Sequence, residues 1–192
     1  MLKKEFFTHY LVTLIWLAGL VILRLVFISG SFSTFGQLTA WIFFCVGAFI
    51  GTFLLDLDQL IYVLIIYPSQ EMSLKVKGLI VQKRFREALN LLAESFQERT
   101  NLPFHNAAFQ VFFMVFCFWV LTSTGSWLGK GLVMAMTLHL LKDIYHCLLK
   151  GKENFLRRWL FWPIKREVSF QEQKIFVILM LLVFLGLNLL LS

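Results

Sequence analysis

Residues 38–67 read LTAWIFFCVGAFIGTFLLDLDQLIYVLIIY, an apolar run whose only charged residues are Asp56 and Asp58. A helix rises about 1.5 Å per residue, so about 20 residues cross the roughly 30 Å hydrocarbon core of a bilayer. The run is too long for one straight span. Irregular backbone at membrane depth is tolerated where it lines a protein cavity. We therefore expect a membrane-spanning helix that can break near Asp56.

The rest of the chain has the same apolar character. Of its 192 residues, 59% are hydrophobic and 15% are charged, whereas soluble domains are roughly 45–50% apolar and about 25% charged. This composition argues against a soluble globule or a disordered tail. We predict a single-domain, all-α, polytopic membrane bundle with about five transmembrane helices. The expected spans are residues 6–29, 38–67, 104–124, 128–149 and 175–191.

Two further segments are expected to lie on the inner membrane surface. In residues 75–98, apolar side chains recur every three or four positions with charges between them, which predicts one amphipathic helix. Residues 154–166 mix Trp and Arg, which suit the headgroup layer. Both segments are predicted to contact membrane lipids.

Basic residues are distributed unevenly between the two ends of the predicted spans. Sixteen of the 18 Lys and Arg residues lie before the first span, between the second and third, or from the end of the fourth to the fifth; Arg24 and Lys130 are the exceptions. Loops rich in Lys and Arg stay cytoplasmic. The pattern predicts a multi-pass inner-membrane protein with a cytoplasmic N-terminus. Because the net charge of +7 is spread between apolar blocks, no nucleic-acid partner is expected.

The three aspartates occupy unusual positions. Asp56, Asp58 and Asp143 lie within apolar spans, whereas all eight glutamates lie in polar connections or at their edges. A charged side chain at mid-bilayer costs roughly 2.5–3.5 kcal/mol on insertion scales, so these aspartates need partners. In the predicted topology, His105 and His139 lie at about the same depth. The sequence therefore predicts a cluster of carboxylates and imidazoles near the cytoplasmic face.

The spacing in the fourth span favours a metal site. At about 100° per residue, Asp143 lies about 40° from His139, and His146 lies about 20° from His139 on its other side. A histidine and a carboxylate four residues apart can share one ion. Imidazole and carboxylate ligands suit Zn, Mn, Fe, Co or Ni. We predict one divalent metal ion with four ligands: Asp56, His105, His139 and Asp143.

Asp58 and His146 are the candidates for a general base or for orienting a ligand. On a regular helix Asp56 and Asp58 point about 200° apart. Both can serve one ion only if the helix breaks, or if one of them orients a ligand instead of binding. A lone histidine in a span also commonly forms a structural hydrogen bond, an alternative that stays open for His146. His9 is interpreted as an interfacial residue.

Four short motifs occur in a familiar order over roughly residues 47–163. They are Asp56-Leu57-Asp58-Gln59, Leu102-Pro103-Phe104-His105-Asn106, Leu138-His139-Leu140-Leu141-Lys142-Asp143 and Phe161-Trp162-Pro163. This order resembles the YdjM-type family of membrane-bound metal-dependent hydrolases. The chain departs from that family at Gln59, where a histidine is usual, and at Leu138, where a serine is usual. Of the family's His-Arg-Gly-x-Thr-His-Ser element, only His105 clearly survives.

The resemblance implies a membrane-embedded, metal-dependent hydrolase that acts at the cytoplasmic face on a lipid or another amphiphilic phosphoester. Four arginines could hold an anionic headgroup or simply anchor the chain at the surface: Arg84, Arg86, Arg157 and Arg158. One alternative is a metal-ion or proton transporter. The outer halves of the spans offer only Arg24 and a few Ser and Thr, which counts against a continuous pathway. Another alternative is a non-catalytic scaffold with a degenerate metal site.

Overall fold

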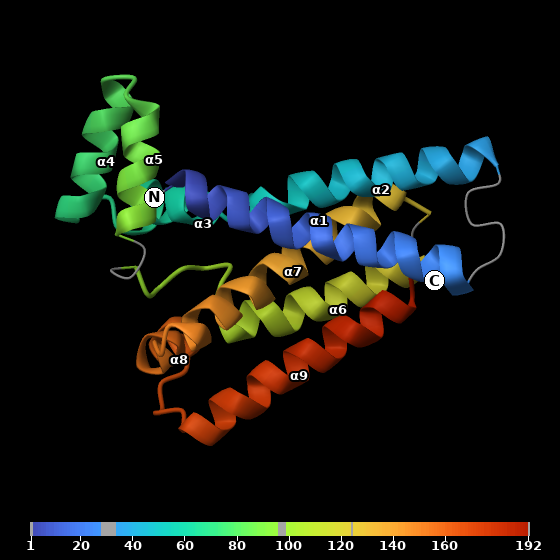
Figure 1. Cartoon of the computed structure of the whole chain (residues 1–192). Coiled ribbons are helices and arrows are strands. Elements are labelled where there is room, and N and C mark those ends of the chain that lie inside the picture. The colour runs from blue at the N-terminus through green and yellow to red at the C-terminus, as the bar shows by residue number, and fades with distance from the viewer. Residues whose placement is uncertain (1, 28–33, 96–98, 124, 192) are drawn as a thin grey trace.

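The computed structural model describes residues 2–27, 34–95, 99–123 and 125–191, and these residues form helices without any strand. Long helices lie side by side in a bundle and alternate in direction (Figure 1). They are α1 (Leu2–Phe27), α2 (Phe35–Leu54), α6 (Ala107–Ser123), α7 (Trp127–Leu149) and α9 (Phe170–Leu189). The predicted all-α bundle is confirmed.

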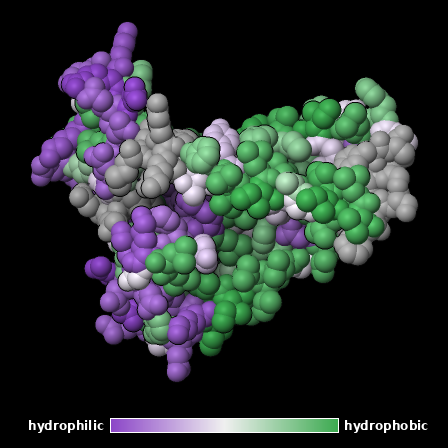
Figure 2. All heavy atoms as spheres, viewed as in Figure 1, coloured by the Kyte–Doolittle hydropathy of each residue, from purple (hydrophilic) through white to green (hydrophobic). Residues whose placement is uncertain are grey.

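Within the described ranges, four helical segments are long and apolar enough to cross a membrane. They are Phe7–Val26, Phe35–Ile66, Trp127–Leu149 and Phe170–Leu189. The expected third span corresponds to α6, which is apolar but falls below that length at 17 residues. Large apolar side chains point outward from the bundle, such as Phe112 at 77% exposure. On the face shown in Figure 2, hydrophobic side chains cover the long helices, as expected for contact with lipid.

Hydrophilic side chains gather at one end of the bundle (Figure 2). We call this the polar end; it carries α3 (Leu57–Ile61), α4 (Glu71–Val81), α5 (Phe85–Glu94) and α8 (Glu153–Phe161). The end of α1, the start of α2 and the end of α9 lie at the opposite end (Figure 1), which we call the far end.

The prediction of one amphipathic helix over residues 75–98 was wrong. The structure has two helices there, α4 and α5, and residues 96–98 lie outside the described part of the chain. Lys83 separates the two helices with a φ of 59°, a left-handed conformation that a continuous right-handed helix cannot contain. The three- or four-residue spacing of apolar side chains therefore continues across the turn between α4 and α5. In residues 154–166 the helix α8 ends at Phe161, shortly before Pro163, which cannot continue it.

Helices α2 and α7 make backbone contact through small residues. A Cβ atom on Gly47 would lie 2.0 Å from the Leu128 carbonyl oxygen, and one on Gly51 would lie 2.2 Å from that of Leu132. From the other helix, a Cβ on Gly131 would lie 2.0 Å from the Phe44 carbonyl oxygen. No larger residue fits at these three positions. Such glycine spacing allows close approach of membrane helices.

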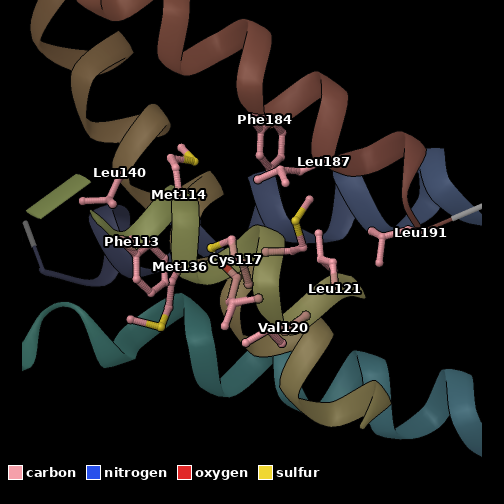
Figure 3. Close-up of a cluster of buried hydrophobic side chains, with 14 of the residues drawn as sticks. Phe113, Met114, Cys117, Val120, Leu121, Met136, Leu140, Phe184, Leu187 and Leu191 are labelled. Carbon is pink, nitrogen blue, oxygen red and sulfur yellow. Dashed lines mark hydrogen bonds between the residues drawn. The ribbon is translucent and has the colours of Figure 1, made fainter. Parts of the chain in front are cut away.

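Helices α6, α7 and α9 share an apolar core, shown in Figure 3. Phe113 and Cys117 of α6, Leu140 of α7, and Phe184 and Leu187 of α9 are buried in it. Helix α7 therefore packs against α6 and α9 as well as against α2.

The second apolar run breaks near Asp56, as expected. Helix α2 ends at Leu54 and α3 begins at Leu57, followed by the π-helix η1 (Tyr62–Ile66). The Asp56 N–H donates to the Phe53 carbonyl at 3.1 Å, a bond to residue i−3 instead of the i−4 bond of an α-helix. The Thr52 carbonyl is therefore left for another donor.

Candidate metal centre

His139 is held by the helix that it packs against. Its Nδ1–H donates to the Thr52 carbonyl oxygen at 2.6 Å, the group that the break at Asp56 leaves available. The His139 side chain is fully buried. In the neutral ring with the hydrogen on Nδ1, Nε2 carries a lone pair. This Nε2 atom has no hydrogen-bond partner among the described residues.

His105 is oriented by Asp58 in the same way. Its Nδ1–H donates to Asp58 Oδ2 at 2.6 Å, and the Phe104 N–H donates to the same oxygen at 3.3 Å. Asp58 is fully buried. Within the described part of the chain, His105 Nε2 also lacks a hydrogen-bond partner. A carboxylate behind an imidazole is the usual way to fix the tautomer and direction of a metal-binding histidine.

The turn that carries His105 is built by the start of α6. The Asn106 side chain accepts a hydrogen bond from the Phe109 N–H at 2.9 Å and so caps this helix. The Gln110 side chain donates to the His105 carbonyl at 3.0 Å. His105 thus lies just before α6, not within its first turn as the sequence had indicated, and its backbone is tied to the helix.

Asp143 lies between the two histidines. Its Oδ2 atom is 3.1 Å from His139 Nε2 and 3.7 Å from His105 Nε2. Asp56 approaches from the broken helix, with Oδ1 3.8 Å from His139 Nε2. The structure therefore brings together all four predicted metal ligands, from α7, from the break after α2 and from the turn before α6.

These separations fit a shared cation. With metal–ligand distances of about 2.1 Å, two ligands of one tetrahedral ion lie about 3.4 Å apart. The donor pairs above range from 3.1 to 3.8 Å. A lone pair on imidazole Nε2 facing a carboxylate oxygen is repulsive unless a positive charge lies between them. A proton or a metal ion can supply that charge.

In the ion-free cluster, a proton on His105 supplies the positive charge between imidazole and carboxylate. Burial alone lowers the pKa of His105, but the carboxylates of Asp58 and Asp143 outweigh burial and raise the pKa to about 10. In the absence of a metal ion, His105 therefore carries a proton near neutral pH. A metal ion must displace this proton in order to bind Nε2.

The structure adds His9, which the sequence interpretation had left at the interface. His9, His139 and Asp143 form a group that could hold a metal ion, because one ligand atom from each lies within 4.8 Å of the others. The His9 and His139 rings stack with centroids 4.3 Å apart. His9 Nε2 accepts a hydrogen bond from Lys142 Nζ at 2.6 Å, and the same ammonium lies 3.0 Å from Asp143 Oδ1. From the sequence, Lys142 had counted only among the basic residues of the predicted cytoplasmic side.

A polar chain continues outward from Asp56. The Gln59 side chain donates to Asp56 Oδ1 at 3.4 Å and accepts from Arg99 Nη2 at 3.0 Å. Arg99 is buried and also donates to Ser95 Oγ and to the Leu92 carbonyl of α5. Helix α5 is thereby connected to the cluster, which gives the amphipathic segment a structural role.

His146 is not joined to the cluster. It lies one turn beyond Asp143 on α7 and is partly exposed. Within the described ranges, no hydrogen bond or ion pair connects it to the other candidate residues. Its predicted role as a base or orienting residue has no geometric support, whereas Asp58 orients His105 directly.

The arrangement offers buried nitrogen and oxygen donors at the polar end of an apolar bundle, with Asp56 open to solvent at 32% exposure. No protein family model, curated protein or solved structure matches the chain. What the protein does must therefore be inferred from these side chains alone.

Proposed function

We propose that this protein is a membrane-embedded, metal-dependent hydrolase that acts at the cytoplasmic face on an amphiphilic substrate. One divalent cation, Zn, Mn or similar, would be held by His105, His139 and Asp143. His9 is not assigned as a ligand, because its Nε2 lone pair accepts a hydrogen bond from Lys142 Nζ. The observation that carries the proposal is the pair of buried imidazole Nε2 atoms, neither with a hydrogen-bond partner among the described residues and both directed at one oxygen of Asp143. Three protein ligands leave a position open, as in catalytic zinc sites.

The remaining residues have distinct proposed roles. When bound, a divalent ion supplies Lewis-acid activation of water. Asp56, which the sequence predicted as a fourth ligand, is the carboxylate at the solvent edge, at 32% exposure; we propose instead that it accepts the proton that water loses. Asp58 is fully buried and holds His105, so it is a positioning residue. Lys142 offsets the negative charge of Asp143.

The proposed location at the cytoplasmic face follows from charge. The cluster joins the start of α3, the turn before α6 and the second half of α7, near the polar end (Figure 1), and sixteen of the 18 Lys and Arg residues lie in the segments predicted to be cytoplasmic. Because the cluster lies where the apolar bundle meets its polar end, a substrate with one polar and one apolar part suits the position. This chemistry is that of a lipid or a related amphiphile.

Metal analysis tests the proposal. We expect purified wild-type protein loaded with Zn or Mn to retain about one equivalent after dialysis, measured by inductively coupled plasma mass spectrometry. Asp143→Asn should retain none, whereas the matched control Glu167→Gln, which removes an exposed carboxylate outside the cluster, should behave as wild type. Equal metal content in wild type and Asp143→Asn, or none in wild type, would contradict the metal site.

Hydrolysis is tested separately with a chromogenic phosphoester in detergent micelles. Turnover should require the metal, and Asp56→Asn should lower kcat at least 100-fold while metal content stays at one equivalent. Full metal occupancy without turnover by the wild type would leave a binding protein and would rule out the hydrolase.

A further inference from the structure

A cavity of about 440 Å³ is lined by residues of α8 and of the segments beside it, and none of the lining residues is a candidate metal ligand. It lies between α8, the start of the 99–106 segment and the connection to α9. Its wall includes Asn101, Arg157, Arg158, Phe161, Trp162 and Arg166. Known small-molecule sites occupy about 300–1,000 Å³, so the cavity is large enough for a phosphorylated headgroup and is larger than a lone phosphate needs.

The charge of the wall favours an anion. The lining contains three arginines and one carboxylate, that of Glu167. Arg166 is already paired with Glu172, with Nη1 3.0 Å from Oε2. Arg157 has only a 3.3 Å hydrogen bond to Asn154 among the described residues, and Arg158 has no hydrogen bond or ion pair there. Two guanidinium groups are therefore available, and guanidinium binds phosphate oxygens in a bidentate manner.

The same helix connects the cavity to the metal-ligand cluster. Trp162 lines the cavity and donates from Nε1 to the Leu102 carbonyl at 3.3 Å. One helical turn earlier, the Trp159 ring lies against the His105 ring, with centroids 5.0 Å apart. Helix α8 thus presents arginines to the cavity on one side and supports a candidate metal ligand on the other.

We propose that this cavity binds a phosphate monoester group, with Arg157 and Arg158 as its principal ligands. As a binding site it needs no metal; as the headgroup subsite of the enzyme, it rests on the proposed function. The phosphate can come from a lipid headgroup or from free phosphate. A lipid source is the expected one, because Trp and Arg together suit the headgroup layer and the cavity exceeds the size of the free ion.

The test uses the full-length protein in detergent and isothermal titration calorimetry. The probes are short-chain dihexanoyl phosphatidic acid, dihexanoyl phosphatidylcholine and inorganic phosphate. We expect phosphatidic acid to bind the wild type at least tenfold more tightly than either of the others. In Arg157→Gln/Arg158→Gln its Kd should rise at least tenfold, whereas in the matched control Lys75→Gln/Lys83→Gln, which removes two exposed cations on the other surface segment, it should stay within twofold.

Each other outcome has a definite meaning. If inorganic phosphate binds as tightly as phosphatidic acid, the source is free phosphate and the arginine site stands. If both double variants weaken binding equally, or if neither does, the cavity is not the site and the proposal is overturned. The single variant Arg158→Gln, at an exposed position, should still weaken binding at least threefold and guards against misfolding of the double variant.

Failure of this inference can be told apart from failure of the proposed function. Arg157→Gln/Arg158→Gln should keep its metal, and Asp143→Asn should keep its affinity for phosphatidic acid. Loss of metal binding in wild type with intact phosphatidic acid binding would remove only the hydrolase. Intact metal with no phosphatidic acid binding that depends on Arg157 and Arg158 would remove only the headgroup site.

Discussion

Polar side chains from different helices meet at both ends of the bundle, but the two ends differ in whether these side chains have partners within the protein. At the far end, the Arg24 guanidinium lies over the rings of Trp41 and Trp127, 4.9 and 5.5 Å from their centroids, and donates to the Leu191 carbonyl. At the polar end, His105 Nε2, His139 Nε2 and Asp58 Oδ1 have no hydrogen-bond partner within the described residues.

This difference distinguishes polar groups that join helices, at the far end, from a candidate binding site, at the polar end. Polar groups that only join helices are expected to find partners within the protein, since a buried group without one costs about 1–3 kcal/mol. At the far end, the Arg24 guanidinium follows this rule. The polar end keeps buried donors aimed at a common point, which is the arrangement that a ligand would complete. Four variants or conditions, taken from the largest expected effect to the smallest, test the contrast.

Gly51→Leu should disrupt both ends at once. Its Cβ would lie 2.2 Å from the Leu132 carbonyl oxygen, a backbone atom that cannot rotate away, so α2 and α7 must separate. We expect at least a tenfold loss of monodisperse protein in fluorescence-detected size-exclusion chromatography. Gly19→Leu is the control, because a Cβ at Gly19 meets nothing within 4 Å. Equal yields of the two variants would contradict the close helix contact.

Lowering the pH from 8 to 6 should weaken metal binding about 100-fold, because each proton that the metal displaces lowers the affinity about tenfold per pH unit. The pKa of His105 is raised to about 10 in the ion-free cluster, so His105 is protonated at both pH values and must lose one proton to bind. Competition with a chromophoric chelator measures the affinity. A pH-independent affinity would show that His105 is not a ligand.

Asp58→Asn should weaken metal binding about 10- to 100-fold, the usual cost of removing a carboxylate behind a ligating histidine. The amide can still accept from His105 Nδ1–H, but without the negative charge that makes the imidazole a stronger ligand. Asn188→Ala, which removes the 2.8 Å hydrogen bond from Trp16 at the other end of the bundle, should leave the affinity unchanged. A matching loss in both variants would point to general destabilisation.

Arg24→Gln should lower the apparent Tm by about 4–8 °C, since cation–π contacts with two rings contribute on the order of 2 kcal/mol and each kcal/mol shifts the Tm by about 2–4 °C at this size. Metal content should not change, because Arg24 lies at the far end. A thermal melt monitored by tryptophan fluorescence and a metal assay on the same sample check both statements. Loss of metal would show that the two ends are not independent.

Much of this architecture could be predicted from residue type and spacing. The apolar runs are long enough to indicate helices without any knowledge of tertiary contacts. A charged side chain in an apolar span costs free energy, so Asp56 and Asp143 could be predicted to have partners. The four-residue spacing of His139 and Asp143 places both on one helix face, where the structure finds them 3.1 Å apart. Helix geometry alone carries that prediction.

Lateral packing could not be predicted in the same way. His9 has the right depth in the first span, which was a usable signal, but its contact with His139 depends on how α1 packs against its neighbours. Lys83 gives no sign in its residue type that the backbone would turn there. The orientation of His139 depends on the Thr52 carbonyl, a backbone group that no residue pattern displays.

Lys142 has a consequence for how such a protein can be made. Its ammonium lies 3.0 Å from Asp143 Oδ1 and so acts as a resident counter-ion at the cluster. Since part of the carboxylate charge is compensated by the chain itself, we expect insertion and assembly to be possible in a metal-poor membrane. Loading would then become a later and reversible stage of maturation, under the control of whatever sets the cell's supply of the ion.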